Sequence, residues 1–279
     1  MSLFLSKKTL VEDLKKACQS FPDVPVVLHS DLLKIGLTNK PTERLEICRD
    51  YEQALQEALK ERALLIPTFN YDFCKTGVYD RLHSPSQVGA LSDYFRLHYP
   101  QLRSFTPIFN FVILHKNESL SLKASHNVLG ADSLFSTLHK QKGLVLFLGA
   151  PFSSNTFIHY VEECNHIGYR YLKKFSGNVV DADKKISISI DYRVRPQIEP
   201  MLGYDFSKLL QEAKEAKIVK ECVVGHGTLL YFQAEMLFDF WSKKMEKDEL
   251  YLLTADSKKQ VQELSQVMGY PFILDMFEK

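Results

Sequence analysis

The sequence is poor in cysteine, in long apolar runs and in net charge. Its 279 residues include five cysteines, which are scattered and form no Cys-x-x-Cys pair. This usage indicates neither a disulfide framework nor a zinc site and is typical of a reducing compartment such as the cytoplasm. Lys and Arg (35) nearly balance Asp and Glu (34), so no electrostatic attraction to nucleic acid or to an anionic membrane is indicated. No stretch approaches the roughly 20 apolar residues that span a bilayer.

Signature motifs of several common enzyme classes are also missing. The sequence has no Walker-type loop, no G-x-G-x-x-G after a strand, no G-x-S-x-G, no H-E-x-x-H and no kinase signature. The first residues, MSLFLSKK, carry their charges after a short apolar core, so we expect no secretory signal peptide. With 45% hydrophobic and 25% charged residues, the composition is that of a soluble globular protein. No Pro-, Gly- or Ser-rich linker divides the chain, so we expect a single domain over residues 1–279.

The order of apolar runs predicts a mixed α/β fold. Short, branched apolar runs predict buried strands at residues 25–28, 63–66 and 144–148, and a strand pair follows at 108–114. Helical spacing predicts helices at residues 10–18, 41–59, 88–97 and 133–140, and residues 69–85 have no period and form a loop that lines a site. We therefore expect a central sheet with helices on both faces.

The last third of the chain has a different pattern. Residues 186–192 alternate between apolar and polar side chains, as in a half-exposed antiparallel strand. Further helices are expected at residues 206–216, 229–244 and 258–266, and a strand at 218–224. These segments predict a C-terminal antiparallel α+β portion that is continuous with the first part. The aromatic side chains of residues 231–241 have two explanations, a dimer face or core packing.

Residues 144–163 hold the most informative pattern. The predicted strand 144–148 stops at Gly149, and a polar turn leads into a helix that Asn155 or Thr156 can cap. Thr156, His159 and Glu162 follow at i, i+3 and i+6, so they lie along one side of that helix. A hydroxyl, an imidazole and a carboxylate beside the carboxyl end of a strand are typical of an active site. The same spacing also occurs in ordinary capped helices whose polar face meets water.

Five short motifs occur in the order and at the distances of a known family. They are a strand that ends in His-Ser before a Gly (residues 26–36), Pro-Thr before an aromatic-flanked Asp (67–73), Arg-Ser-x-x-Pro (103–107), a His before Gly-x-x-Ser (126–133), and Asn-Thr-x-x-His-x-x-Glu after a strand (155–162). The last of these is the most specific. On these residues the chain resembles, nearly from end to end, the aminoglycoside 3-N-acetyltransferase family, which transfers acetyl from acetyl-CoA to an amino group.

The resemblance implies a role for each matched residue. It makes His126 the general base that takes a proton from the substrate amine, with Glu162 orienting it and stabilising its charge. It places His29 beside the thioester in the acetyl-CoA site. The remaining residues that it places near the pantetheine arm or the phosphates are Ser30, Ser104 and Thr156. Direct transfer from acetyl-CoA as co-substrate needs neither a metal nor an enzyme nucleophile.

Departures from the family pattern bear on the acceptor. Thr106 stands where the family has a His, and Phe69-Asn70 replaces His-Thr at the end of the second strand. The chain also lacks the acidic excess expected of a pocket for polycationic drugs. We therefore expect a different small-molecule amine, such as an amino sugar, either free or linked to a nucleotide. Two alternatives stay open, a relative that binds CoA without catalysis and a transferase for hydroxyl acceptors or longer acyl groups.

Overall fold

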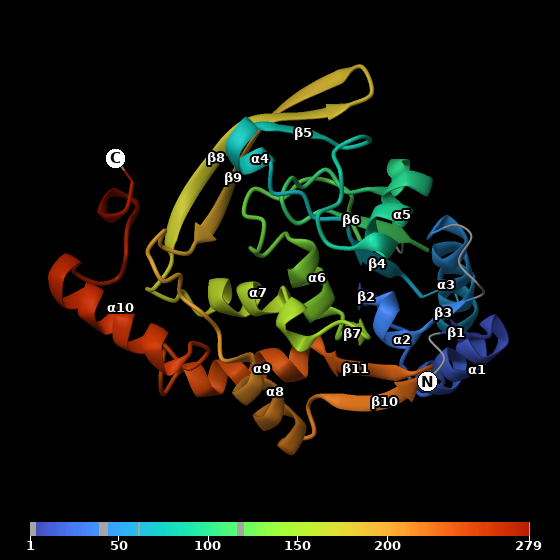
Figure 1. Cartoon of the computed structure of the whole chain (residues 1–279). Helices are drawn as coiled ribbons and strands as arrows, with labels where there is room; N and C mark the ends of the chain where they lie inside the picture. The colour runs from blue at the N-terminus through green and yellow to red at the C-terminus, as the bar shows by residue number, and fades with distance from the viewer. Residues whose placement is uncertain (1–3, 39–43, 61, 116–119, 279) are drawn as a thin grey trace.

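A six-stranded sheet organises the protein (Figure 1). The computed structural model describes residues 4–38, 44–60, 62–115 and 120–278. The order of the strands across this sheet is β10 (Lys220–Val224), β11 (Gly227–Gln233), β7 (Leu144–Leu148), β2 (Val26–Ser30), β4 (Leu64–Pro67) and β6 (Phe111–Leu114). The three central strands β7, β2 and β4 run parallel, and antiparallel strands close both edges. The predicted mixed α/β fold is confirmed.

The register brings the carboxyl ends of the three parallel strands together at one end of the sheet. Val26 of β2 aligns with Leu64 and Leu144, and Ser30 at the end of β2 aligns with Leu148. The predicted runs form these strands because branched and aromatic side chains are buried on both faces, as parallel sheets require. Open α/β sheets bind their ligands at the carboxyl ends of their strands.

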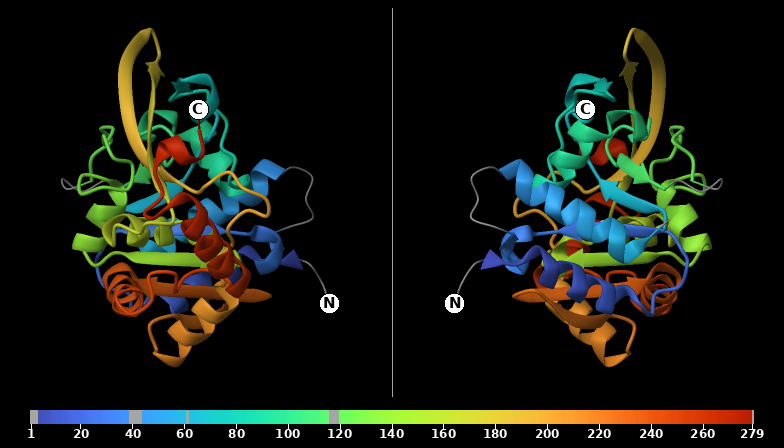
Figure 2. Two further views of the ribbon diagram at one scale, coloured as in Figure 1. Left: turned by 90° about the vertical axis from the view of Figure 1, so that its left-hand side faces the viewer. Right: turned by 90° about the vertical axis from the view of Figure 1, so that its right-hand side faces the viewer.

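Alternating side chains of the sheet pack into two layers. Val26, Leu28 and Leu146 contact helices α1 (Lys7–Cys18), α3 (Arg44–Leu59) and α5 (Ala90–His98). Val27, Val145 and Phe147 point to the other face, which is covered by α6 (Leu134–Lys140), α7 (Phe157–Cys164), α8 (Phe206–Glu215) and α9 (Ala234–Met245). The period of two along each strand produces this division, and Figure 2 shows helices on both sides of the sheet.

A long hairpin projects from the body of the molecule (Figures 1 and 2). It consists of β8 (Tyr171–Asp181) and β9 (Lys184–Val194), which pair antiparallel over their whole length, and β5 (Val78–Asp80) adds a parallel strand to β8. The antiparallel strand expected at residues 186–192 is therefore present. The remaining elements of the described residues are the helix α10 (Ala255–Met268) and several short ones: β1 (Phe4–Leu5), β3 (Leu37–Thr38), α2 (Leu32–Ile35), α4 (Phe73–Thr76), and 3-10 turns at Pro100–Leu102, Phe152–Ser154 and Leu274–Met276.

The stretch predicted as one helix over residues 229–244 is divided. Its first part is strand β11, whose residues Leu229 to Gln233 pair with β7, and only then does α9 begin at Ala234. A short apolar and aromatic run fits a buried strand as well as a helix, and pairing with β7 decides the outcome. Trp241 on α9 is fully buried, and its ring centroid lies 6.2 Å from that of Phe152, so core packing accounts for it.

None of the helices in the described part of the chain has the length and apolarity needed to cross a membrane.

Candidate active site

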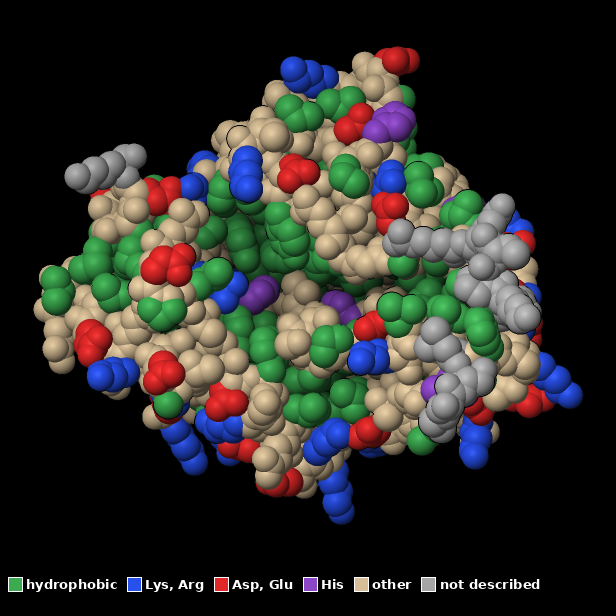
Figure 3. Space-filling model, in the orientation of Figure 1, with side chains coloured by type: hydrophobic (Ala, Val, Ile, Leu, Met, Phe, Trp, Pro, Cys, Tyr) green, Lys and Arg blue, Asp and Glu red, His purple; other side chains and the backbone are tan. Residues whose placement is uncertain are grey.

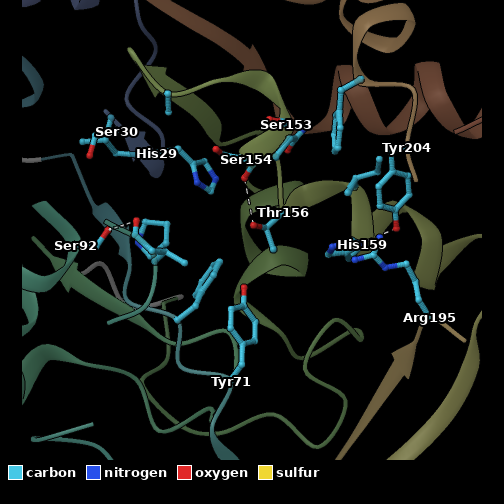
Figure 4. Close-up of a pocket in the computed structure, with 18 residues that line it drawn as sticks. His29, Ser30, Tyr71, Ser92, Ser153, Ser154, Thr156, His159, Arg195 and Tyr204 are labelled. Carbon is cyan, nitrogen blue, oxygen red and sulfur yellow. Dashed lines mark hydrogen bonds between the residues drawn. The ribbon is translucent and has the colours of Figure 1, made fainter. Parts of the chain in front are cut away.

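A cavity of about 410 Å³ opens at the carboxyl edge of the parallel strands. His29 and Ser30 from the end of β2 lie on one side of it, and Thr156 and His159 come from the start of α7. In Figure 4 these side chains surround a common space, with Tyr204 and Arg195 beside His159. Figure 3 shows the same face as a hollow with histidine side chains at its floor. The structure thus brings three of the expected site residues, His29, Ser30 and Thr156, into one cavity.

Gly149 shapes the turn from β7 into this cavity. Its φ is +69°, a conformation that L side chains rarely adopt, and an added Cβ would lie 2.5 Å from the carbonyl oxygen of Asp31. The chain then passes through the 3-10 turn Phe152–Ser154 and enters α7. The close approach of this turn to Asp31 sets where α7 begins relative to the end of β2.

Glu162 is the buried centre of the polar network beside the cavity. Its carboxylate lies 2.9 Å from His159 Nδ1 and accepts hydrogen bonds from the hydroxyls of Tyr169 (2.8 Å) and Tyr204 (2.7 Å). The Nε of Arg170 lies 3.1 Å from Glu162 Oε2, and both side chains are almost fully buried. Four partners therefore surround one carboxylate that is removed from bulk solvent.

The network fixes the ionisation of its members. Burial raises the pKa of Glu162, but the charge of Arg170 and the hydrogen bonds from His159 and Tyr204 outweigh it and lower the pKa to about 2. Burial and the charge of Arg170 lower the pKa of His159, and Glu162 offsets only part of this. Because Arg170 already balances the carboxylate, His159 is neutral near pH 7.

The tautomer of His159 follows from these partners. An ionised Glu162 can only accept, so the proton of the neutral imidazole lies on Nδ1. Arg170 Nη2, which lies 3.1 Å from the same nitrogen, donates at 2.6 Å to the Tyr204 hydroxyl. No hydrogen bond within the described residues engages Nε2, and the His159 ring lines the cavity. A basic nitrogen lone pair is therefore available at the cavity.

His126 does not pair with Glu162, which corrects the expected arrangement. Its side chain is exposed and lines a separate hollow of about 370 Å³ beside Ile186 and Ile188 of the hairpin. The residue after His126 does contact α7, because Asn127 Nδ2 donates a hydrogen bond to Glu163 Oε1 at 2.8 Å. The Glu162 carboxylate is meanwhile fully occupied by side chains nearer to it.

Ser104 is also placed away from the cavity. It is fully buried, its Oγ accepts the Phe111 N–H at 3.1 Å, and its carbonyl accepts the Tyr79 hydroxyl at 3.0 Å. These bonds join the start of β6 to the neighbouring loop, so Ser104 supports the fold and does not face a ligand. Thr106, at the position of the family His, is likewise buried, and its hydroxyl accepts the Ser125 N–H.

His29 lies across the cavity from the His159 network. Its ring stacks on Phe147 with the centroids 5.0 Å apart, and burial lowers its pKa to about 4. His29 is therefore neutral at physiological pH. Phe69, which stands in place of the family's His, lines the cavity and packs edge-on against Phe109 and Phe111.

Asn155 is a site residue that sequence reasoning left out of the ligand contacts. It lines the cavity and is 1% exposed, and neither the nitrogen nor the oxygen of its side-chain amide has a hydrogen-bond partner. Buried amides are almost always paired. The unpaired amide of Asn155 is therefore unusual for a buried side chain, and it lies in the wall of the cavity.

An apolar pocket of about 550 Å³ adjoins the cavity. The two share Ser30, Ala150 and Ser154, and the pocket continues between α2, α3 and α5 with Leu32, Ile47 and other apolar side chains.

Within the described ranges no group of three or more His, Cys, Asp or Glu side chains is arranged to hold a metal ion.

Comparison with known proteins agrees with this architecture. A family model described as aminoglycoside 3-N-acetyltransferase matches residues 27–246. The chain belongs to the aminoglycoside 3-N-acetyltransferase family. The match runs from β2 to the end of α9 and so includes the cavity and the Glu162 network. A search of curated proteins found no match.

Several solved structures share the fold at low sequence identity. The YokD protein from Bacillus subtilis is 22% identical in sequence and has a TM-score of 0.66. The match covers 88% of this chain and 94% of the YokD chain. An AAC-IIIb structure, binary with CoASH, is 19% identical with coverage of 88% and 97% and a TM-score of 0.71. A mutant of aminoglycoside acetyltransferase AAC(3)-IVa in complex with a gentamicin is 19% identical, with coverage of 93% and 95% and a TM-score of 0.70. These values establish the fold.

Proposed function

We propose that the protein transfers the acetyl group of acetyl-CoA to a primary amine of a small molecule, with an amino sugar as the acceptor class. The observation that carries this proposal is His159, whose Nδ1 is held by Glu162 while Nε2 has no partner among the described residues and lies at the cavity. Once the nitrogen of a neutral primary amine has attacked the thioester, it carries a proton that must leave, so a positioned base is what the reaction needs.

The proposed reaction uses the cavity as follows. After an ammonium acceptor has lost one proton to solvent, its amine nitrogen attacks the thioester carbonyl carbon and forms a C–N bond. His159 Nε2 takes a second proton from that nitrogen, the C–S bond breaks, and the proton passes to the departing thiolate. The products are an N-acetylated amine and CoA. Glu162 stabilises the imidazolium that forms during the transfer, because its carboxylate is bonded to Nδ1–H.

Residues of the other side of the cavity fit the acyl donor. The pantetheine arm contains amides, and the buried, unpaired amide of Asn155 lies in the cavity wall, where a small shift of the side chain would bring its N–H donors and its carbonyl acceptor to such a group. The adjoining apolar pocket, entered past Ser30 and Ser154, suits the aliphatic parts of the same arm. His29 is neutral and stacked on Phe147, so it can contact the thioester without adding charge. Holding donor and acceptor together supplies much of the rate enhancement.

The experiment has two parts. Acetyl-CoA is titrated calorimetrically into the protein with ATP as a control, and thiol release is then followed with a panel of amines and alcohols, the products being weighed by mass spectrometry. The proposal predicts saturable binding of acetyl-CoA and an amine-dependent gain of one acetyl group. Binding without turnover of any acceptor favours a CoA-binding relative instead. Absence of acetyl-CoA binding to folded protein contradicts the proposal.

A further inference from the structure

The charge of the cavity is one-sided. Among the described residues, no Asp or Glu lines it, and Arg195 is the one Lys or Arg that does. Arg195 follows directly after β9, and its Nη1 donates to the Leu202 carbonyl at 2.7 Å, which fixes the guanidinium beside the cavity. No ion pair within the described residues engages it, so its remaining N–H groups are free for a ligand.

Neighbouring acidic groups are already neutralised by other arginines. Glu162 lies against Arg170, and Glu163 Oε2 lies 3.2 Å from Arg193 Nε. Arg195 therefore contributes an uncompensated positive charge to this end of the cavity. A buried or half-buried cation that faces a ligand space in this way favours an anionic group on the ligand.

Arg195 lies at the same end of the cavity as the proposed base. Its guanidinium carbon is 5.6 Å from the Tyr204 ring centroid, and that ring is 5.7 Å from the His159 ring. The charge of Arg195 also contributes to the lowered pKa of His159, which reflects their closeness. In Figure 4, Arg195, Tyr204 and His159 form one group, and His29 and Ser30 lie across the cavity.

The two ends of the cavity suit different substrates. The end with Ser30 and Ser154 continues into the apolar pocket and so suits the acyl donor. The acceptor amine must reach His159, so a group bound beside His159 belongs to the acceptor. Arg195 is within reach of the acceptor and lies away from the donor's apolar path.

We propose that Arg195 binds an anionic group of the acceptor, a carboxylate or a phosphate, so that the substrate is an amine that also carries a negative charge. This inference rests on the proposed acetyl transfer. The planar guanidinium matches both anions in a bidentate geometry. A polycationic amine would place ammonium groups beside Arg195 with no carboxylate of the described cavity wall to receive them.

Matched acceptor pairs test the proposal. Glucosamine 6-phosphate is compared with glucosamine, and 4-aminobutyrate with butylamine, by thiol release at saturating acetyl-CoA. The anionic member is expected to have a KM lower by about 10- to 100-fold, as one charge-assisted hydrogen-bonded pair provides. Arg195→Gln is expected to abolish this preference, so that the two members of each pair have the same KM, and Arg195→Lys to restore part of the preference. The control variant is Lys220→Gln, which removes a charge from the exposed strand β10.

Several results would overturn the proposal. One is equal or better turnover of the neutral amines, or of gentamicin as a polycationic acceptor. Another is a weaker affinity for acetyl-CoA in Arg195→Gln with an unchanged acceptor KM, because Arg195 would then bind the phosphates of CoA. If no acceptor is turned over, the same pairs are titrated into CoA-loaded protein, and the absence of a preference for the anionic member decides against it. If the folded wild-type protein does not bind acetyl-CoA, this is a separate result that counts against the acetyl transfer itself.

Discussion

Replacing Glu162 by Gln tests the polar network at its centre. The substitution keeps the size of the side chain and removes a charge that Arg170 faces at 3.1 Å, with side-chain exposures of 1% for Glu162 and 2% for Arg170. Leaving a buried charge without its partner costs about 3–5 kcal/mol. A melting-temperature change of about 2–4 °C per kcal/mol then predicts a decrease of roughly 10 °C. The new amide NH₂ also faces the donors of His159 and two tyrosines, which adds to the loss.

Glu163→Gln is the matched control for this prediction. Glu163 is the next residue of α7, and its pair with Arg193 is more exposed than the Glu162–Arg170 pair, with side-chain exposures of 11% for Glu163 and 24% for Arg193. Its removal is expected to lower stability by only about 1 kcal/mol. Calorimetric melting of both variants at pH 7 measures the difference. A Glu162→Gln protein that melts within about 2 °C of wild type, or above Glu163→Gln, would refute the reasoning.

Three further predictions concern other walls of the cavity. Burial lowers the pKa of His29 to about 4, so below pH 6.5 the unfolded chain binds a proton that the folded chain excludes. The free energy of unfolding therefore decreases as the pH is lowered. Between pH 7 and pH 5 this amounts to about 2 kcal/mol, which denaturant titrations of wild type and His29→Gln should show, and equal pH dependence would contradict it. Asn155→Leu removes two unpaired polar atoms, so it should leave stability unchanged or higher while weakening acetyl-CoA about tenfold by calorimetry, and unchanged affinity would show that Asn155 contacts no donor. Gly149→Ala should lose more than about 2 kcal/mol, because its Cβ would meet the Asp31 carbonyl at 2.5 Å and its φ is +69°, and a variant as stable as wild type in denaturant titration would contradict this.

The sequence indicated the local parts of the fold well. The apolar runs of β2, β4 and β7 were evident because each is buried on both faces, and the polar turn after Gly149 marked the start of α7. The spacing of His159 and Glu162 placed them on one side of a helix, and the structure joins them at 2.9 Å. An i, i+3 contact depends only on helix geometry, so it can be predicted from spacing.

Long-range contacts were not predictable in the same way. The pairing of His126 with Glu162 required two segments 36 residues apart to meet in one register, and the structure joins the following residues, Asn127 and Glu163, instead. Tyr204 and Arg170 reach Glu162 from separate loops, and no local spacing announces them. The unpaired amide of Asn155 likewise becomes visible only once its surroundings are known.

Comparing His159→Gln with His126→Gln tests the central claim most directly. Both variants are assayed for amine-dependent thiol release from acetyl-CoA, with acetyl-CoA binding and melting temperature measured on the same samples. We predict that His159→Gln loses about 10²- to 10⁴-fold in kcat while still binding acetyl-CoA, because a positioned base contributes that much. His126→Gln should retain a rate near wild type, because its side chain is exposed and lies in a separate hollow. A folded His159→Gln with full activity, or a large loss in His126→Gln alone, would contradict the account.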